Sequence, residues 1–282
     1  MTYRIDTTPP PHGWRRANPG REATLVLVGC GGTGSFLAEA LGRLLIGCRA
    51  ALYLVDHDRV EPHNVARQAF DPADVGRFKA QVLAERLAYR FGRTVGYAVQ
   101  PYDATLHAQV FREPVSRLNL LIGCVDNAAA RRALAATLGH ESDVWWLDTG
   151  NSRNSGQVLL GNAAHVDGLR GSFLSQPRVC RALPAPSLQR PDLLDAPPAP
   201  RPILDCAAAV AQAEQGQTVN QAVAAVAASF VEKLLDDTCC WMAAYFDLDD
   251  GTLRCLPAEP RAIAGLVGLH LNAITRRGER ER

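Results

Sequence analysis

The stretch TLVLVGCGGTGSFLAEALGRLLIG, residues 24–47, decides the fold. It begins with an unbroken run of apolar and β-branched residues, which is typical of a strand buried on both faces of a sheet. Gly29, Gly31 and Gly34 then form G-x-G-x-x-G, and apolar residues recur at helical spacing after them. This order predicts a turn that presents a helix N-terminus to a nucleotide phosphate. A glycine turn that serves only helix–strand packing is the alternative.

Strand-like and helix-like segments alternate along the following residues. Residues 51–56 predict a second buried strand, and residues 78–91 predict an amphipathic helix. Another helix is expected to begin near residue 127. Further strands are predicted at 94–102, 118–126, 144–151 and 155–161. Such alternation is typical of an α/β fold, here a Rossmann-like, mainly parallel, doubly wound sheet.

The pattern changes after residue 176. Residues 177–202 contain too much Pro for a helix or a central strand, and they predict a crossover loop. Residues 203–282 are expected to be a C-terminal extension of the same domain. In it, TVNQAVAAVAASFVEKLL predicts a helix, and the Asp-Gly pair in AYFDLDDGTLRCL predicts two antiparallel strands. Residues 1–22 show no periodicity and are expected to be an N-terminal arm.

The composition argues against several classes of protein. The 282 residues suffice for one large α/β domain or two small ones. A net charge of +1 gives no electrostatic footprint of nucleic-acid binding or membrane attraction. The sequence contains no apolar run long enough for a membrane span and no signal-peptide core. We therefore expect a cytoplasmic protein that binds neither nucleic acid nor membrane.

Cysteine usage is consistent with that location. The chain contains eight cysteines but no C-x-x-C pair. Without secretory signals, these cysteines are expected to be reduced thiols. A structural zinc site usually draws on several thiolates or imidazoles at fixed spacing, so no zinc is expected.

A polar cluster follows the second predicted strand, in EPHNVARQ at residues 61–68. Asp56, at the end of that strand, can accept hydrogen bonds from ribose hydroxyls. Asn64, Arg67 and Lys79 are predicted to converge on a triphosphate, because Arg offers a planar fork and Lys a compact charge. An NAD(P)-dependent oxidoreductase would explain the glycines and Asp56, but it gives Arg67 and Lys79 no role. A solvated loop would explain each residue alone, though not their joint spacing.

The motifs VLVGCGGTGS, LVDHDRVEPHNVARQ and CVDN, together with Lys79, resemble the ThiF/MoeB/HesA family of adenylating enzymes, which shares a domain with ubiquitin-activating enzymes. The similarity covers residues 22–160 well and 203–270 more loosely. Within that family, the chain is most similar to the ThiF-like member of the bacterial PRTRC cassette. The resemblance implies that residues 23–176 form an ATP-binding adenylation domain.

The resemblance also implies a role for each residue of the site. Asn64, Arg67 and Lys79 would hold phosphates, and Asp56 the ribose. The implied cofactor-binding residues are Gly29, Gly31, Gly32, Gly34, Asp56, Asp58, Asn64, Arg67, Gln68, Lys79, Asp126 and Asn127. For Gln68 no role follows from its chemistry alone.

The resemblance implies that Asp126 coordinates Mg²⁺ that bridges the phosphates, and the position of Asp126 agrees with this role. A carboxylate at the carboxyl end of a parallel strand faces the ligand crevice. Mg²⁺ favours one or two carboxylates together with phosphate oxygens. The alternative role for Asp126 is to cap the helix that follows, since Asp is a preferred N-cap residue.

The family reaction is the ATP-dependent adenylation of the C-terminal carboxylate of a small ubiquitin-like, β-grasp protein. The resemblance implies Arg67, Lys79 and Asp126 as catalytic residues. Some relatives then transfer the acyl group to a cysteine, for which Cys206 is the candidate and Cys180 a weaker one. A small buried residue packing a helix start is the alternative for Cys206.

Two features depart from the family pattern. Many relatives carry two C-x-x-C pairs for zinc, and this chain carries none. Many also place an Arg near the N-terminus that reaches the partner subunit's ATP site, a role for which Arg15 or Arg16 is the candidate. A homodimer is implied by the resemblance. A nucleotide-binding scaffold without enzymatic activity is a third hypothesis, beside the adenylating enzyme and the oxidoreductase.

Overall fold

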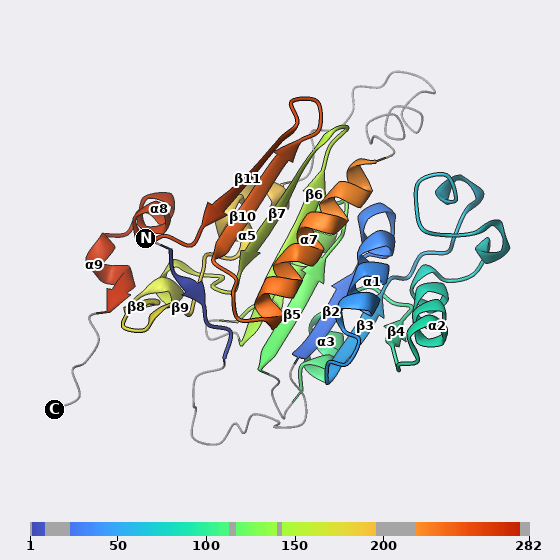
Figure 1. Cartoon of the computed structure of the whole chain (residues 1–282), viewed down its shortest axis with the longest axis horizontal. Helices are drawn as coiled ribbons and strands as arrows, with labels where there is room; N and C mark the ends of the chain where they lie inside the picture. The colour runs from blue at the N-terminus through green and yellow to red at the C-terminus, as the bar shows by residue number, and fades with distance from the viewer. Residues whose placement is uncertain (1, 9–22, 113–116, 140–142, 196–217, 277–282) are drawn as a thin grey trace.

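The computed structural model describes residues 2–8, 23–112, 117–139, 143–195 and 218–276. These residues form an eight-stranded sheet with helices on both faces, and a four-stranded sheet at the end of the molecule far from α2 (Lys79–Phe91) (Figure 1). The large sheet has the strand order β11-β10-β7-β6-β5-β2-β3-β4. The five strands from β6 to β4 pair in parallel, whereas β7, β10 and β11 pair antiparallel. The predicted fold class is therefore confirmed.

The predicted strands of the large sheet are all present, although the one expected at 94–102 has only three residues. The parallel strands are β2 (Ala23–Val28), β3 (Ala50–Val55), β4 (Gly96–Ala98), β5 (Leu118–Gly123) and β6 (Val144–Asn151). The antiparallel strands are β7 (Ser155–Gly161), β10 (Trp241–Asp247) and β11 (Thr252–Pro257), the last two forming the expected hairpin.

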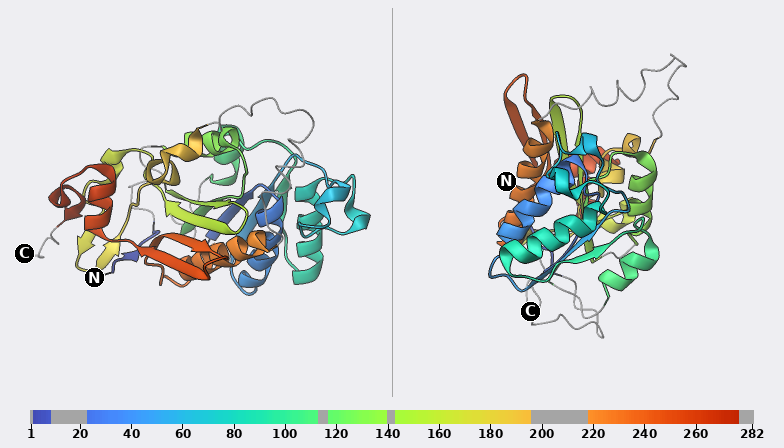
Figure 2. Two further views of the ribbon diagram at one scale, coloured as in Figure 1. Left: turned by 90° about the horizontal axis from the view of Figure 1, so that it is seen from above. Right: turned by 90° about the vertical axis from the view of Figure 1, so that its right-hand side faces the viewer.

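Helices cover both faces of this sheet, as two further views show (Figure 2). One face carries α1 (Gly32–Leu44), α2 and α7 (Val219–Leu235), and the other carries α3 (Ala104–Val110) and α4 (Ala128–Ala136). The helices expected from 36–47, 78–91, 127 onward and 218–235 are thus confirmed.

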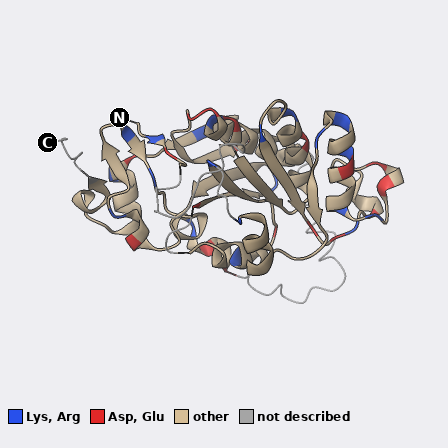
Figure 3. Ribbon diagram, turned by 90° about the horizontal axis from the view of Figure 1, so that it is seen from below, with Lys and Arg blue, Asp and Glu red and all other residues tan. Residues whose placement is uncertain are grey.

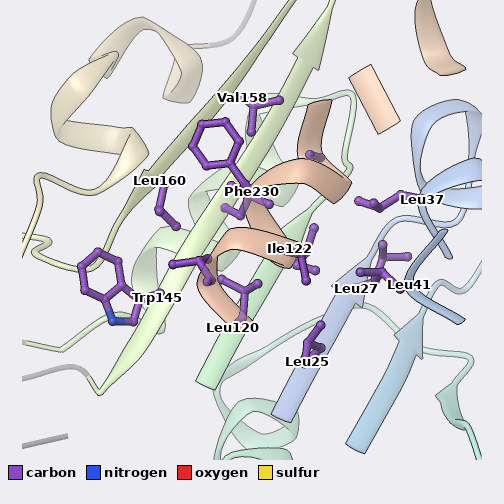
Figure 4. Close-up of a cluster of buried hydrophobic side chains, with 14 of the residues drawn as sticks. Leu25, Leu27, Leu37, Leu41, Leu120, Ile122, Trp145, Val158, Leu160 and Phe230 are labelled. Carbon is purple, nitrogen blue, oxygen red and sulfur yellow. The ribbon is translucent and has the colours of Figure 1, made fainter. Parts of the chain in front are cut away.

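The alternation of side chains along each strand explains why both faces are apolar. Leu25 and Leu27 of β2 point to the α1 and α7 face, and Val26 and Val28 point to the α3 and α4 face. Phe230 of α7 lies over this first face among leucine, isoleucine and valine side chains of β5 and β7 (Figure 4). A sheet buried on both sides needs uninterrupted apolar strands, which is the pattern that TLVLV displays.

The crossover-loop prediction for 177–202 is wrong for the described part of that segment. Residues up to 195 contain the strand β9 (Arg178–Cys180), the short helix α5 (Pro186–Gln189) and the 3-10 turn η4 (Pro191–Leu194). Proline fits here because it opens α5 and η4, where the first turn has no use for its missing N–H. The rest of the segment lies outside the described residues.

The small sheet joins the two ends of the described chain. Its order is β1-β9-β8-β12, so β1 (Arg4–Ile5) pairs with β9, and β8 (Phe173–Ser175) pairs with β9 and β12 (Thr275–Arg276). Within the N-terminal arm expected at residues 1–22, the structure describes residues 2–8, and Ile5 of β1 is fully buried against the core. The remaining elements are η1 (Pro62–Asn64), η2 (Pro72–Asp74), η3 (Val166–Leu169), α8 (Pro260–Val267) and α9 (Leu271–Ile274).

Charged residues lie mainly on helices and loops (Figure 3). In the five parallel strands of the large sheet, Asp148 is the one acidic or basic side chain. Among the described helices, none has the length and apolar character that crossing a lipid bilayer would require.

Candidate functional site

The carboxyl ends of the parallel strands open into one cleft of about 1040 Å³. Ligands of open α/β sheets bind at this position, because the turns that leave the strands diverge there. The predicted residues that line it are Gly29, Gly31, Gly32, Asp56, Asp58, Asn64, Arg67, Gln68, Lys79, Asp126 and Asn127. The structure therefore brings together every predicted nucleotide residue except Gly34.

The glycines of the first turn serve different purposes. A Cβ on Gly34 would lie 1.8 Å from the Gly29 carbonyl oxygen, and a Cβ on Gly29, whose φ is +89°, would lie 2.5 Å from the Cys124 carbonyl oxygen. These two glycines are required by packing between α1, β2 and β5. A Cβ on Gly31 would find its nearest atom 4.0 Å away, on Gln68. The space around the Cα atom of Gly31 is therefore open, and Gly31 lies on the side of the turn that lines the cleft.

Asp56 is held rigidly at the end of β3. Its Oδ2 accepts a hydrogen bond from the backbone N–H of Cys30 at 2.6 Å, and its Oδ1 accepts one from the backbone N–H of Asp58 at 2.8 Å. Burial raises the pKa of the Asp56 carboxyl, whereas the two backbone N–H groups and Lys79 lower it. Each carboxylate oxygen keeps a second lone pair, so Asp56 remains able to accept hydrogen bonds from a ligand.

Lys79 is a buried cation at the start of α2. Its side chain is 9% exposed, and its Nζ lies 3.2 Å from Oδ2 of Asp58. The Lys79 backbone N–H also donates to the Asp58 carbonyl at 2.9 Å. These contacts tie the loop after β3 to α2, so the ammonium group has a fixed place in the cleft wall. An ammonium on a fixed stem needs little reorganisation when it meets an anionic ligand.

The segment 61–68 folds into a compact turn on the cleft wall. Asn64 is buried, and its Oδ1 accepts the Glu61 backbone N–H at 3.0 Å. Its carbonyl accepts the backbone N–H groups of Arg67 and Gln68 at 3.1 and 2.9 Å. Arg67 and Gln68 are thereby directed into the cleft, and Oε1 of the buried Gln68 has no hydrogen-bond partner among the described residues. Asn64 therefore acts at least in part by shaping the turn.

The structure shows that Asn127, and not Asp126, caps the N-terminus of α4. The N-cap of α4 is Asn127, whose Oδ1 accepts the Ala130 backbone N–H at 2.8 Å. Asp126 is exposed beside it and accepts a hydrogen bond from Nδ2 of Asn127 at 3.2 Å. The capping alternative for Asp126 is therefore wrong, and Asp126 lines the cleft.

Of the two cysteines predicted as acyl acceptors, the structure describes Cys180 but not Cys206. Cys206 lies outside the described residues. Cys180 is buried in β9, where burial raises the pKa of its thiol, so the weaker candidate is wrong as an accessible nucleophile. Burial also raises the pKa of Cys30 inside the glycine turn and that of Cys124 to about 12.

A second part of the cleft was absent from the sequence prediction. We call it the antiparallel half and define it by Asn151, Gln157, Arg190 and Tyr245; the parallel half consists of the turns after β2, β3 and β5. Gln157 and Tyr245 are direct partners in the register of β7 and β10. Arg190 donates to Oε1 of Gln157 at 2.9 Å and pairs with Asp192 through two hydrogen bonds.

A buried ion pair joins α4 and β6 beside the cleft. Asp148 of β6 is fully buried, and Nε of Arg131 lies 3.1 Å from its Oδ2. Burial raises the pKa of Asp148 to about 7, while the Arg131 charge and hydrogen bonds lower it. Arg131 also donates to the Thr149 carbonyl at 3.0 Å and lines the cleft. It ties α4 to the end of β6.

The fold and the cleft define an α/β protein in which a glycine turn and a buried cation line a cleft at the carboxyl ends of the parallel strands. The chain belongs to the ThiF family, whose model matches residues 18–253. It is 34% identical over 152 residues to ubiquitin-like modifier-activating enzyme 5 of Xenopus laevis, and 34% identical over 144 residues to that of Drosophila willistoni. These matches cover 50% and 48% of this chain but only 37% and 34% of the relatives. The matched region thus spans about a third of those proteins.

Solved structures share the fold. Escherichia coli MccB superposes with a TM-score of 0.54 over 84% of this chain and 63% of MccB, at 16% identity. A structure of PaaA gives a TM-score of 0.53 over 83% of this chain and 64% of PaaA, at 17% identity. At these identities the likeness shows the architecture, and the activity must be argued from the cleft.

Proposed function

We propose that the protein uses ATP and Mg²⁺ to adenylate the C-terminal carboxylate of a small ubiquitin-like, β-grasp protein. A carboxylate oxygen attacks the α-phosphorus, and the bond from that phosphorus to the bridging oxygen breaks. Pyrophosphate leaves with the electron pair, and the acyl-adenylate remains. Such a displacement requires positioning and neutralisation of charge rather than a protein nucleophile.

The observation that carries the proposal is the convergence of Arg67, Lys79 and Asp126 on the cleft that the glycine turn opens. A nicotinamide dinucleotide would use the turn and Asp56, and the buried Lys79 would then serve only to pair with Asp58. A triphosphate would bring anionic oxygens within reach of both cations. The adenylation hypothesis therefore accounts for more of the cleft than the oxidoreductase hypothesis.

The residues present fit ATP with Mg²⁺. Gly31 leaves open space where a phosphate can approach the backbone, and the Oε1 atom of Gln68 is buried without a partner among the described residues. Asp56 would hold the ribose, and Arg67 and Lys79 the phosphates. Asp126 would supply the carboxylate for Mg²⁺, which neutralises phosphate charge when bound. His57 and the carboxylates of Asp56 and Asp58 also place ligand atoms within 4.8 Å of one another.

The relatives support the chemistry but not a particular substrate. Two are ubiquitin-like modifier-activating enzymes by name, and MccB has been solved together with AMPCPP and selenomethionine-labelled MccA. We extend the activation of a small protein or peptide to this chain on the strength of its cleft. The narrower assignment to the ThiF-like member of the PRTRC cassette, and the homodimer, rest on the sequence resemblance.

ATP–pyrophosphate exchange tests the proposal directly. The assay uses the full chain with candidate small β-grasp proteins from the same genomic neighbourhood. We expect exchange with the wild type, and a fall of about 100-fold or more in Arg67→Ala and in Asp126→Ala. The matched controls are Arg77→Ala and Asp167→Ala, which remove exposed charges outside the cleft and are expected to retain exchange.

The three hypotheses, an adenylating enzyme, a scaffold and an oxidoreductase, predict different results in binding and exchange assays. Exchange that survives both cleft substitutions contradicts the site assignment. ATP binding without exchange for any candidate favours the scaffold hypothesis, and tighter binding of a nicotinamide dinucleotide than of ATP favours the oxidoreductase.

Transfer of the acyl group to Cys206 is a second step that we propose on the sequence resemblance. The thioester would form by attack of the thiolate on the acyl carbon, with AMP as the leaving group. A thiol-sensitive adduct on the wild type that is missing from Cys206→Ala would support this step. An adduct that persists in Cys206→Ala would place the acyl group elsewhere.

A further inference from the structure

Asn220 is a buried polar residue at the border between the two halves of the cleft. It lies in the first turn of α7, is 1% exposed and lines the cleft. Its Oδ1 accepts hydrogen bonds from Oγ1 of Thr33 at 3.2 Å and from Nδ2 of Asn151 at 2.6 Å. Thr33 belongs to the parallel half and Asn151 to the antiparallel half, so one amide joins the two.

The other polar atom of this amide, Nδ2, is buried and has no hydrogen-bond partner among the described residues. Rotating the amide by half a turn would not remove the problem. Nδ2 would then face the Nδ2 donor of Asn151, so the amide keeps Oδ1 toward Asn151 and Thr33, and Nδ2 remains the atom without a partner among the described residues. A buried amide donor left unsatisfied costs about 1–3 kcal/mol, so its retention at this position calls for an explanation.

The surroundings of Asn220 favour an oxygen-bearing ligand. A Cβ on Gly32 would lie 2.6 Å from Nδ2, so the glycine is what allows the amide to sit against the turn. The first turn of α7 adds backbone N–H groups and a partial positive charge. It lies beside the start of α1 (Figure 1). The helix ends and the amide thus present donors at the border between the halves.

We propose that Asn220 binds the acyl oxygen of the substrate as its carboxylate meets the α-phosphate. This inference rests on the proposed adenylation. The phosphates are assigned to the parallel half, and the substrate chain must therefore arrive along the antiparallel half. Nδ2 of Asn220 lies where the two meet, and it donates to the oxygen that stays on the acyl carbon. The residue orients the attacking carboxylate, and its hydrogen bonds to Thr33 and Asn151 keep it in place.

A stable mimic of the acyl-adenylate tests this role without the protein substrate. In 5′-O-(glycylsulfamoyl)adenosine, a sulfamate replaces the phosphate and glycine is the smallest aminoacyl group. Calorimetry gives the Kd of this mimic and of AMP for the full chain. We expect the wild type to bind the mimic about tenfold more tightly than AMP. In Asn220→Ala that preference falls to about one, which corresponds to one hydrogen bond, while the Kd of AMP changes less than about twofold.

A second substitution and a matched control exclude a purely structural role. Asn220→Asp keeps the oxygens that accept from Thr33 and Asn151 but loses the donor, so its preference for the mimic should also disappear. AMP carries more negative charge than the sulfamate, so simple repulsion would raise the preference instead. The control, Asn162→Ala, removes an amide that holds Arg181 and Leu183 outside the cleft. It should lower the melting temperature and keep the preference.

The outcomes separate the two proposals. A wild type that does not prefer the mimic over AMP contradicts the adenylation itself. A wild type with the preference and an Asn220→Ala variant that retains it contradicts only the role of Asn220. Equal losses for AMP and the mimic in Asn220→Ala would place the amide on the phosphate and overturn the assignment to the acyl oxygen.

Discussion

The two halves of the cleft are built in different ways. The parallel half consists of turns that each follow one strand, and its charged groups, Asp56 and Lys79, are fixed by contacts within the segment 56–79 and to the glycine turn. The antiparallel half brings together residues of β6, β7 and β10 and Arg190 after α5, and the pairing of β10 with β7 places Tyr245 opposite Gln157. A local motif thus supplies the half assigned to the nucleotide, whereas tertiary pairing supplies the half assigned to the protein substrate. We expect substitutions in the two halves to affect different kinetic constants.

The largest effect is expected from Lys79→Met, which removes the ammonium group of the parallel half and keeps most of the apolar stem. The rate of ATP–pyrophosphate exchange should fall about 100- to 1000-fold, because a fixed charge near the reacting phosphates is lost. The fall should appear in kcat, which exchange kinetics at saturating ATP and substrate would measure.

Asp58→Asn provides the comparison for that result, because it removes the partner of Lys79 and leaves the ammonium in place. The partner is more than half exposed, so its loss should cost less than about tenfold. An equal loss in the two variants would mean that the ion pair, rather than the lysine charge, is what exchange requires.

The second prediction compares two glycines of the same turn, Gly34, which packing requires, and Gly31, which is expected to contact the ligand. Gly34→Ala should lower the free energy of unfolding by about 3 kcal/mol, because its Cβ would meet the Gly29 carbonyl oxygen and the backbone must move. Gly31→Ala meets no close neighbour and should leave the melting temperature nearly unchanged while weakening ATP binding. Urea unfolding and calorimetric titration measure the two quantities. The interpretation fails if Gly31→Ala unfolds as easily as Gly34→Ala.

The parallel half could be predicted from the sequence because its signals are local. A glycine turn after an apolar run, an acid at the end of the next strand and the residues of EPHNVARQ lie close together in the chain, and strand order follows from their alternation. The same reasoning missed the capping role of Asn127, because both neighbouring residue types are good caps and only geometry distinguishes them.

The antiparallel half and Asn220 could not be predicted in this way. Asn220 contacts Thr33, a residue 187 positions earlier, and the periodicity of neither segment predicts this contact. The small sheet was missed because its strands have two or three residues, too few to show an alternating pattern. The prolines of 177–202 suggested a loop, although at helix starts they are compatible with regular structure.

The third effect concerns the buried Arg131–Asp148 pair, and it depends on pH. The pKa of Asp148 is raised to about 7, so the folded state binds this proton more tightly than the unfolded chain does. The resulting stabilisation is complete below the unfolded pKa of about 4 and is lost as the pH rises through about 7. Its steepest loss is about 1.4 kcal/mol per pH unit.

The variant Asp148→Asn has no carboxyl group to titrate at this position. As the pH rises from 4.5 to 7.5, the free energy of unfolding of the wild type should therefore fall relative to that of the variant. Urea unfolding at several pH values measures this difference, and other titrating groups cancel in it. A difference that is constant over this range would show that Asp148 stays ionised beside Arg131.

The smallest effect, and the one that most directly distinguishes the halves, is expected from Arg190→Gln. Arg190 holds Gln157 and Asp192 through its guanidinium, and its side chain is 40% exposed. An ion pair with this exposure contributes at most about 1 kcal/mol, so the KM for the protein substrate should rise roughly threefold. The KM for ATP should not change, because Arg190 belongs to the antiparallel half.

The control Arg170→Gln breaks an exposed ion pair with Asp167 outside the cleft and should change neither constant. Exchange assays that vary one substrate at a time measure both constants, and a parallel rise in the KM for ATP would show that the two halves are not independent.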